Sequence, residues 1–371
     1  MKTTVLQHSD VSLSAAGISV HIDVRIGHMA RFEVVREGQF SAAFHRVPWA
    51  DDNAFEGRER FASAPHLERM SGDFFCAPFA LSDVEPAPSH GWPANSNWTV
   101  VSNEKWRGGQ MVVMALDRPV MGARLLKALT VRDHHPFLYQ KHTFEGGAGR
   151  VPVANHAMVT LPHGGTISTS PKQFAITPKQ ALETDPQRGL SILKYPAVGK
   201  DLRKFPRADG RTADLLRCPV DVGHDDFVTL VEQAGAQLGW TAVVRTQEGD
   251  VALMLKNPKE LPVTMLWYSN GGRHYWPWNG QHRHVLGVED GCADAVHGHL
   301  SSISENDLSN MGAKTAIALN PTGSVDVRHV IGNVPIHEGC TEVLAIRSRS
   351  GILEIQFQSK TLELPFDNAF L

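Results

Sequence analysis

Four short segments of the chain bring together side chains that can exchange protons or hold a polar ligand. They are ERMSGDFFCAPF at 68–79, HGWPANSNW at 90–98, PVANHAMVTLPHGG at 152–165 and WYSNGGRHYWPWNGQHRHVLGVEDGCA at 267–293. Each mixes histidine, arginine or a carboxylate with aromatic residues and glycine. Flat rings with polar partners suit a ligand that has apolar C–H faces and a rim of hydroxyls, as a sugar has.

Each candidate residue in these segments also has an alternative interpretation, in which its role is purely structural. His156 precedes the apolar run AMVTL, so it is either a site residue or a core histidine bonded to the backbone. Glu289 follows the buried-looking strand VLGV, where a carboxylate must be paired or face a pocket. EDG is also typical of a surface turn. The rings of Trp92, Trp98 and the pair at 276 and 278 either pack in the core or line a pocket.

Composition and charge restrict the function classes. The 371 residues carry a net charge of −3 with no basic run, so no electrostatic footprint indicates a nucleic-acid partner. No apolar run approaches the roughly 20 residues of a membrane span, and the N-terminus has no signal-peptide segment. We therefore expect no membrane partner and a cytoplasmic location. Phosphate-binding loops, dinucleotide fingerprints, H-E-x-x-H and G-x-S-x-G are absent from the sequence.

The spacing of cysteine and histidine residues bears on metal chemistry and disulfides. The four cysteines are far apart in the chain and form no C-x-x-C pair, so we expect reduced, buried thiols. The histidine pairs at 134–135, 282 and 284, and 297 and 299 suggest a rival hypothesis, a metal-dependent enzyme. In a strand, His282 and His284 would share a face and could bind one metal. Histidine-rich polar loops explain them better, and we expect no metal.

Strand patterns dominate the chain. Alternation in GILEIQFQSKTLEL and short apolar runs such as VALMLKN, LPVTMLWYS and VDVRHVIG predict strands separated by glycine and proline turns. One stretch, DDFVTLVEQAG at 225–235, has helical spacing. We expect a mainly β protein with few short helices, a single domain over residues 1–371, and an excursion at about 177–215.

In this order the four segments resemble the galactose mutarotase-like superfamily, which includes aldose 1-epimerases and hexose-6-phosphate epimerases. The resemblance rests on Arg69 before FFCAPF, His90 in HGWPANSNW, His156 in PVANHAMV and Glu289 in LGVEDG. LNPTG at 319–323 resembles the Leu-x-Pro-Gly turn of the family with one residue inserted. The match covers about residues 30–335.

The resemblance implies a large antiparallel β-sandwich, the β-supersandwich of that superfamily, and roles for particular residues. Glu289 would be the base, His156 the acid and His90 a substrate contact near the ring oxygen. The predicted substrate-binding residues are Arg69, Trp92, Asn95, Asp225 and Trp278. Two departures stand out. Trp92 follows Gly91 where the family often has glycine or phenylalanine, and GHDDF offers both Asp225 and Asp226 for one family aspartate.

The activity that the resemblance implies is aldose 1-epimerisation by acid–base opening and closing of a sugar ring, which needs no cofactor. The alternatives are a non-catalytic carbohydrate-binding or regulatory protein on the same fold, and a hexose-6-phosphate epimerase. The expected partner is a small-molecule sugar. The sequence leaves a homodimer open.

Overall fold

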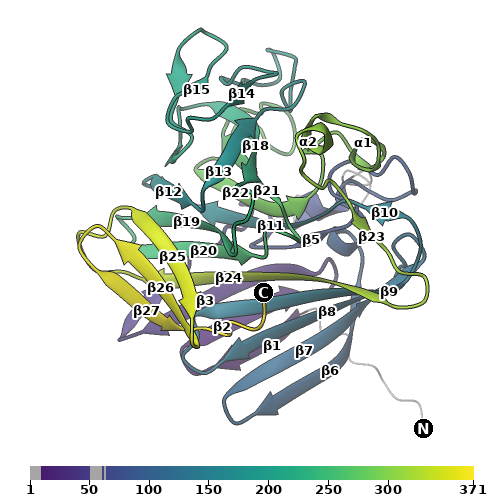
Figure 1. The fold of residues 1–371 in the computed structure, drawn as a ribbon, viewed down its shortest axis with the longest axis vertical. Helices are drawn as coiled ribbons and strands as arrows, with labels where there is room; N and C mark the ends of the chain where they lie inside the picture. The colour runs from purple at the N-terminus through teal and green to yellow at the C-terminus, as the bar shows by residue number, and fades with distance from the viewer. Residues whose placement is uncertain (1–9, 51–60, 62–63) are drawn as a thin grey trace.

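Two large antiparallel sheets dominate the computed structural model, which describes residues 10–50, 61 and 64–371 (Figure 1). The first sheet has nine strands, in spatial order β17 (Arg217–Cys218), β12 (Gly165–Thr169), β19 (Gly239–Arg245), β20 (Asp250–Lys256), β24 (Ser324–Pro335), β9 (Phe137–Gly146), β8 (Ala123–Arg132), β7 (Gly109–Leu116) and β6 (Trp98–Trp106). The second has seven, in the order β14 (Val198–Gly199), β13 (Lys172–Ile176), β18 (His224–Glu232), β21 (Val263–Asn270), β22 (Val285–Cys292), β11 (Val153–Thr160) and β5 (Phe75–Cys76).

Smaller elements surround these sheets. A four-stranded sheet contains β1 (Asp10–Ala15), β2 (Ile18–Asp23), β3 (His28–Arg36) and β4 (Gln39–Ser41), and a three-stranded sheet contains β25 (Val343–Arg349), β26 (Ile352–Phe357) and β27 (Thr361–Pro365). Two strand pairs are β10 (Arg150–Val151) with β23 (Ile317–Ala318), and β15 (Phe205–Pro206) with β16 (Thr212–Ala213). The helices are short: α1 (His299–Ile303), α2 (Asp307–Asn310) and the 3-10 turns η2 (Pro65–Glu68) and η3 (Trp92–Ala94). The predicted mainly β sandwich with few short helices is confirmed.

The seven-stranded sheet is buried on both faces. Leu266 and Val288 point to one face and share a core cluster with Leu138 of β9, in the nine-stranded sheet. Their neighbours Met265 and Trp267 point to the other face and belong to a second cluster. Because successive strand residues alternate between faces, every second residue of β11, β18, β21 and β22 faces this second cluster. That face carries the candidate site.

The helix predicted at 225–235 is wrong, because these residues form most of strand β18. All nine residues of β18 are buried, with Phe227 and Val231 on one face and Val228 and Leu230 on the other. Apolar residues that must cover both faces of a buried strand can reproduce helical spacing by chance.

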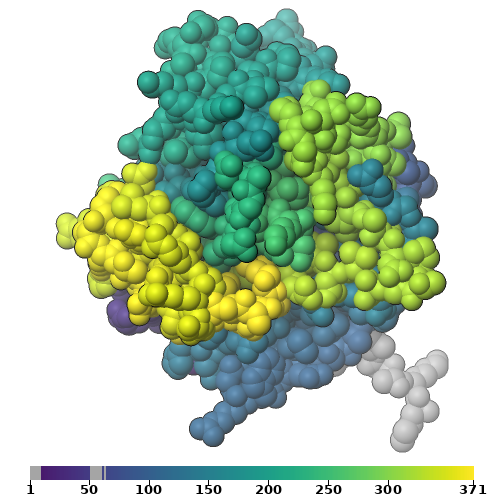
Figure 2. Space-filling view, in the orientation of Figure 1, coloured from purple at the N-terminus to yellow at the C-terminus, as the bar shows by residue number. Residues whose placement is uncertain are grey.

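The predicted C-terminal strands are confirmed as β25, β26 and β27, the yellow block in Figures 1 and 2. Their inner residues, including Leu353 and Ile355, pack in a third core cluster with Leu253 and Val330 of the nine-stranded sheet. This small sheet therefore covers part of the outer face of the larger one. The predicted excursion at 177–215 holds only the short strands β14, β15 and β16, at the top of Figure 1.

The four cysteines are free and buried, as predicted. Within the described residues, no helix is both long enough and apolar enough to cross a membrane.

Candidate active site

A cavity of about 420 Å³ lies on the face of the seven-stranded sheet that points away from the nine-stranded sheet. Its volume falls within the range of small-molecule sites, about 300–1,000 Å³. Most of its walls are aromatic or aliphatic, and a few polar side chains converge on it. These are His66, Ser89, His90, His156, Arg273, Tyr275 and Glu289.

The floor of the cavity is the pair formed by His156 and Glu289. The two residues lie directly opposite each other in the antiparallel pairing of β11 with β22, so both side chains point to the same face. His156 Nε2 is 3.1 Å from Glu289 Oε1, and the residues are 3% and 2% exposed. Glu289 sits inside β22, so the alternative reading of EDG as a surface turn is wrong.

Gly287 leaves room for this pair. It lies two residues before Glu289 on the same face of β22. A Cβ at Gly287 would come within 3.0 Å of both Glu289 Oε1 and Trp267 Cβ. A side chain at this position would therefore press on the carboxylate, and glycine keeps it free to face the cavity.

Burial drives both members of the pair toward their uncharged forms. It raises the pKa of Glu289 well above its usual value, against an opposing effect of Arg273. It also lowers the pKa of His156 to about 3. Glu289 Oε2 and His156 Nδ1 are buried without a protein partner. The floor therefore favours a protonated Glu289 beside a neutral His156, with two polar atoms still available to a ligand.

His90 forms one wall of the cavity beside this pair. Its ring centroid is 5.5 Å from that of His156, and its Nδ1 accepts a hydrogen bond of 3.4 Å from the backbone N–H of Ala80. The left-handed φ of 66° at His90 is followed by φ 73° at Gly91. A Cβ at Gly91 would lie 2.0 Å from the carbonyl oxygen of Ala77, so only glycine fits there.

His66 is a lining residue that the sequence motifs did not identify. It lies in η2, and its ring centroid is 4.9 Å from that of His90. Its Nδ1 is 3.1 Å from Asn95 Oδ1, which also accepts the backbone N–H of His66 at 2.7 Å. Since an acceptor oxygen faces Nδ1, Nδ1 is the donor and Nε2 is the acceptor of the neutral ring. Burial lowers the pKa of His66 to about 4, which keeps it neutral.

Asn95, predicted to bind substrate, is placed behind His66 instead of in the lining. Its Nδ2 donates to the carbonyl oxygens of Ser89, at 2.8 Å, and Gly91, at 2.6 Å. One amide thus ties η2 to the turn that carries His90. Within the described chain it is a positioning residue for the two imidazoles.

Replacing Asn95 by Ala should loosen this wall. Hydrogen bonds to the His66 backbone, Ser89 and Gly91 would be lost, and the free energy of unfolding should fall by about 1–3 kcal/mol. We also expect a ligand of the cavity to bind more weakly, because His66 and His90 would no longer be held in place. The matched control is Asn97→Ala at an exposed position of the same segment. Equal stability and equal ligand affinity for the two variants would refute the positioning role.

The remaining wall consists of tryptophans from the segment after β21, with Arg273. The Arg273 guanidinium carbon is 4.7 Å from the ring centroid of Trp278 and 5.2 Å from that of Trp267. Trp278, one of the predicted substrate-binding residues, lines the cavity. Arg273 Nε is buried without a protein partner, and its terminal nitrogen is 3.1 Å from Asp225.

Asp225 lies on the face of β18 that points toward the cavity, but its side chain sits behind this wall. Its carboxylate accepts hydrogen bonds from Trp267 Nε1 at 2.6 Å and from Ser269 Oγ at 2.8 Å. Asp225 therefore fixes Trp267 and Arg273 and is absent from the lining residues.

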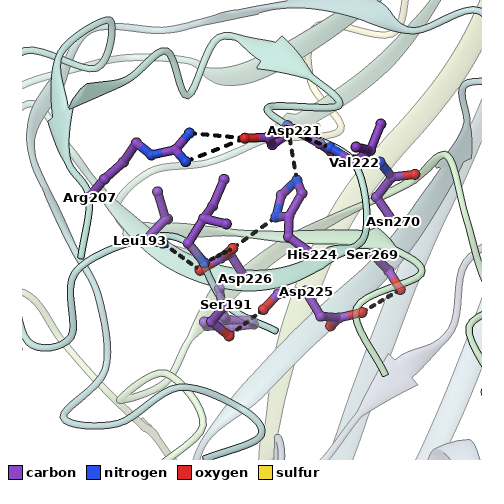
Figure 3. Close-up of polar contacts among 12 residues, drawn as sticks. Ser191, Leu193, Arg207, Asp221, Val222, His224, Asp225, Asp226, Ser269 and Asn270 are labelled. Atoms are coloured by element: carbon purple, nitrogen blue, oxygen red, sulfur yellow. Dashed lines mark hydrogen bonds and ion pairs between the residues drawn. The ribbon is translucent and has the colours of Figure 1, made fainter. Parts of the chain in front are cut away.

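Asp226 points to the opposite face, because strand residues alternate. Its carboxylate accepts the backbone N–H groups of Ile192 and Leu193, both at 3.0 Å, and lies 2.8 Å from His224 Nδ1 (Figure 3). The two aspartates thus differ in position: Asp225 supports the cavity wall, whereas Asp226 anchors the excursion to β18.

Two further predicted substrate contacts lie outside the lining. Arg69 Nε donates a hydrogen bond of 2.9 Å to Asp23 Oδ2. The guanidinium carbon of Arg118 lies 4.5 Å from the centroid of the Trp92 ring. Trp98 is 2% exposed and donates to the carbonyl of Pro93, so its structural reading as a core residue is correct.

The geometry assumed for a metal at His282 and His284 is wrong, because neither residue lies in a strand. His282 Nδ1 bonds to Ser269 Oγ at 2.8 Å, and its ring stacks on Trp267. Among the residues that the structure describes, no group of three or more His, Cys, Asp or Glu is arranged to hold a metal ion.

Comparison with known proteins assigns the fold. No protein-family model and no curated protein matches the sequence. Among solved structures, the chain is similar to a putative aldose 1-epimerase from Escherichia coli K12, with a TM-score of 0.56, 14% identity, and coverage of 88% of this chain and 99% of that one. A putative aldose 1-epimerase from Klebsiella pneumoniae gives a TM-score of 0.57 at 14% identity, covering 88% and 78%. A putative mutarotase from Salmonella typhimurium gives 0.55 at 11%, covering 88% and 90%.

These likenesses confirm the fold inferred from the four motifs. The chain has the galactose mutarotase-like β-sandwich fold. Since one fold supports several functions, the activity has to be argued from the cavity.

Proposed function

We propose that the protein is an aldose 1-epimerase-type isomerase whose acid–base unit is the pair of His156 and Glu289. The observation that carries the proposal is the 3.1 Å contact between these two buried groups at the floor of a cavity lined by aromatic residues. An aromatic wall suits the C–H faces of a sugar ring, and the neutral imidazoles of His66 and His90 suit its hydroxyls.

The chemistry needs one proton to leave the C1 hydroxyl and one to reach the ring oxygen. The bond between C1 and the ring oxygen breaks, the C1–C2 bond turns, and the same transfers run in reverse on the other face of C1. A pair that holds one shared proton supplies both functions, because one partner accepts while the other donates.

The position of that proton fixes the roles. In the free protein, burial favours the proton on Glu289 and an unprotonated His156. In that state His156 is the base and Glu289 the acid. Moving the proton across the contact gives the roles that the resemblance implies, Glu289 as base and His156 as acid. The number of protons on the pair then determines activity more than which of the two residues holds the proton.

The pH dependence of kcat/KM tests this pairing. Below about pH 3 a second proton on His156 would remove the base, and above the raised pKa of Glu289 the pair would lose its only proton. We therefore expect no loss of activity as pH falls through 6.5, the usual pKa of histidine, and a loss of activity on the alkaline side as Glu289 gives up its proton. Rates would be measured by exchange NMR after subtracting the buffer rate, with folding checked by circular dichroism. An acidic limb centred near pH 6.5, with activity lost below it, would contradict the pairing.

A hexose 6-phosphate is the second candidate substrate. The observation in its favour is Arg273, whose buried Nε has no protein partner and whose side chain lines the cavity. Guanidinium groups bind phosphate well. The ion pair with Asp225 weakens this argument, because it already offsets part of the positive charge.

Saturation-transfer NMR on a panel of aldoses and their 6-phosphates distinguishes these functions. The proposal predicts enzyme-dependent exchange between anomers for at least one free aldose. Exchange confined to the 6-phosphates would favour the second candidate. Sugar binding without exchange would identify a non-catalytic carbohydrate-binding protein and refute the proposal.

A further inference from the structure

A second cavity, of about 620 Å³, adjoins the one that holds the catalytic pair. The two cavities share the side chains of Ser89, His90, Leu182 and Val296, so these residues form a common rim between them. The catalytic cavity therefore borders, at His90, a second space formed by other segments of the chain. The residues lining only this outer cavity are Ala80, Leu81, Pro178, Lys179, Gln180, Ala181 and His297.

Hydrogen bonds hold the outer cavity together across three segments. The backbone N–H of Lys179 donates to His297 Nε2 at 3.3 Å, and His297 Nδ1 is 3.3 Å from Asp294 Oδ2. On the other side, the backbone N–H of His299 donates to the carbonyl of Leu81 at 3.0 Å. The outer cavity is thus built from segments that are tied to one another.

The outer cavity has the chemistry of a carbohydrate subsite. Leu81 is an exposed apolar side chain, at 54%, and with Leu182 and Val296 it offers aliphatic surface to the C–H face of a ring. The exposed side chains of Lys179 and Gln180 supply hydrogen-bond donors and an amide acceptor for hydroxyls.

From this adjacency we infer that the substrate is a reducing oligosaccharide, the shortest being a disaccharide, with its second sugar ring in the outer cavity. This inference rests on the proposed function and extends it to a substrate class. Epimerisation at C1 requires a free anomeric hydroxyl beside His156 and Glu289. The second ring must therefore be attached through another carbon of the reducing sugar, and it leaves the catalytic cavity past His90.

The test compares a monosaccharide with disaccharides that carry the same monosaccharide at their reducing end. The monosaccharide is the aldose that exchanges fastest, and the disaccharides are linked through C3, C4 or C6. Anomer exchange by NMR gives kcat/KM for each. We expect at least one disaccharide to exceed its monosaccharide by about tenfold, equivalent to roughly 1.4 kcal/mol of added binding.

A variant that fills only the outer cavity isolates its contribution. Ala181→Trp should abolish the disaccharide advantage while kcat/KM for the monosaccharide stays within about twofold. The matched control is Ala236→Trp, at a half-buried alanine that lines a different cavity. Lys179→Ala should reduce the advantage in the same direction, with Lys200→Ala, in another cavity, as its control.

The outcomes separate the two claims. Exchange of the monosaccharide with no disaccharide advantage would overturn the second subsite and leave the proposed function standing. Equal losses on both sugars in Ala181→Trp would also overturn the subsite. No exchange with any sugar would overturn the proposed function and the extension together.

Discussion

Replacing Glu289 by Gln should lower enzyme-dependent anomer exchange by at least about a hundredfold, since a general acid or base typically contributes 10²–10⁴-fold. Glutamine fills the same volume and can bond to His156, but it cannot take up or release the shared proton. Polarimetry on a freshly dissolved anomer measures the rate. An unchanged rate would exclude Glu289 from the proton transfer.

Asp290→Asn is the matched control in the same strand. Asp290 is buried on the opposite face of β22, 2.9 Å from Lys256 Nζ and 3.0 Å from His329 Nε2. Breaking this network should destabilise the protein, while the folded fraction should keep its exchange rate. A loss of rate equal to that of Glu289→Gln would mean that damage to the strand, and not loss of the proton carrier, explains both variants.

The Glu289→Gln substitution also has a predicted effect on stability. Burial raises the pKa of Glu289 above its unfolded value, so this group stabilises the fold relative to the unfolded chain at low pH. That contribution is lost as pH rises through the folded pKa. Urea unfolding between pH 5 and pH 9 should therefore show a smaller alkaline loss of stability for Glu289→Gln than for the unsubstituted protein. A larger loss in the variant would contradict the raised pKa.

Replacing His156 by Gln should be similarly damaging, with a loss of about 10²–10⁴-fold in kcat/KM. The amide can still bond to Glu289 Oε1 from β11, but it cannot exchange a proton near neutral pH. Because both residues act as one unit, the double variant should be scarcely slower than either single variant. Additive losses, measured by the same polarimetric assay, would show that the two groups work independently.

Sequence patterns located His156 and Glu289, the proposed acid–base pair, because each of them lies in a regular strand. PVANHAMV and VLGVED become β11 and β22, and the register of these strands places His156 opposite Glu289. The strands of the C-terminal segment followed from simple alternation for the same reason. Whether a single segment forms a strand depends mainly on its own residues, so it can be predicted from the sequence pattern.

The cavity walls were less predictable because they depend on contacts between distant segments. His66 becomes a lining residue through Asn95, 29 positions away, and no spacing rule connects the two. Arg69 bonds to Asp23 and Asp225 bonds to Trp267, so both side chains lie outside the cavity lining. The helix at 225–235 failed because burial on both faces of a strand can imitate helical spacing.

HGWPANSNW supplies a wall through His90 and a support through Asn95, whereas Trp92 packs with Arg118 outside the lining. The aromatic wall comes instead from the segment after β21, with Trp276 and Trp278. Differences in substrate preference should therefore be sought around Arg273 and Trp278 before Trp92.

The most direct test of the central claim is the rate of α-to-β exchange of an accepted aldose, measured by saturation-transfer NMR against enzyme concentration. The protein and its His156→Gln, Glu289→Gln double variant would be compared at the same pH. We predict a rate that rises linearly with concentration for the protein and stays at the buffer rate for the double variant. Equal slopes for the two proteins would contradict the assignment of catalysis to this pair.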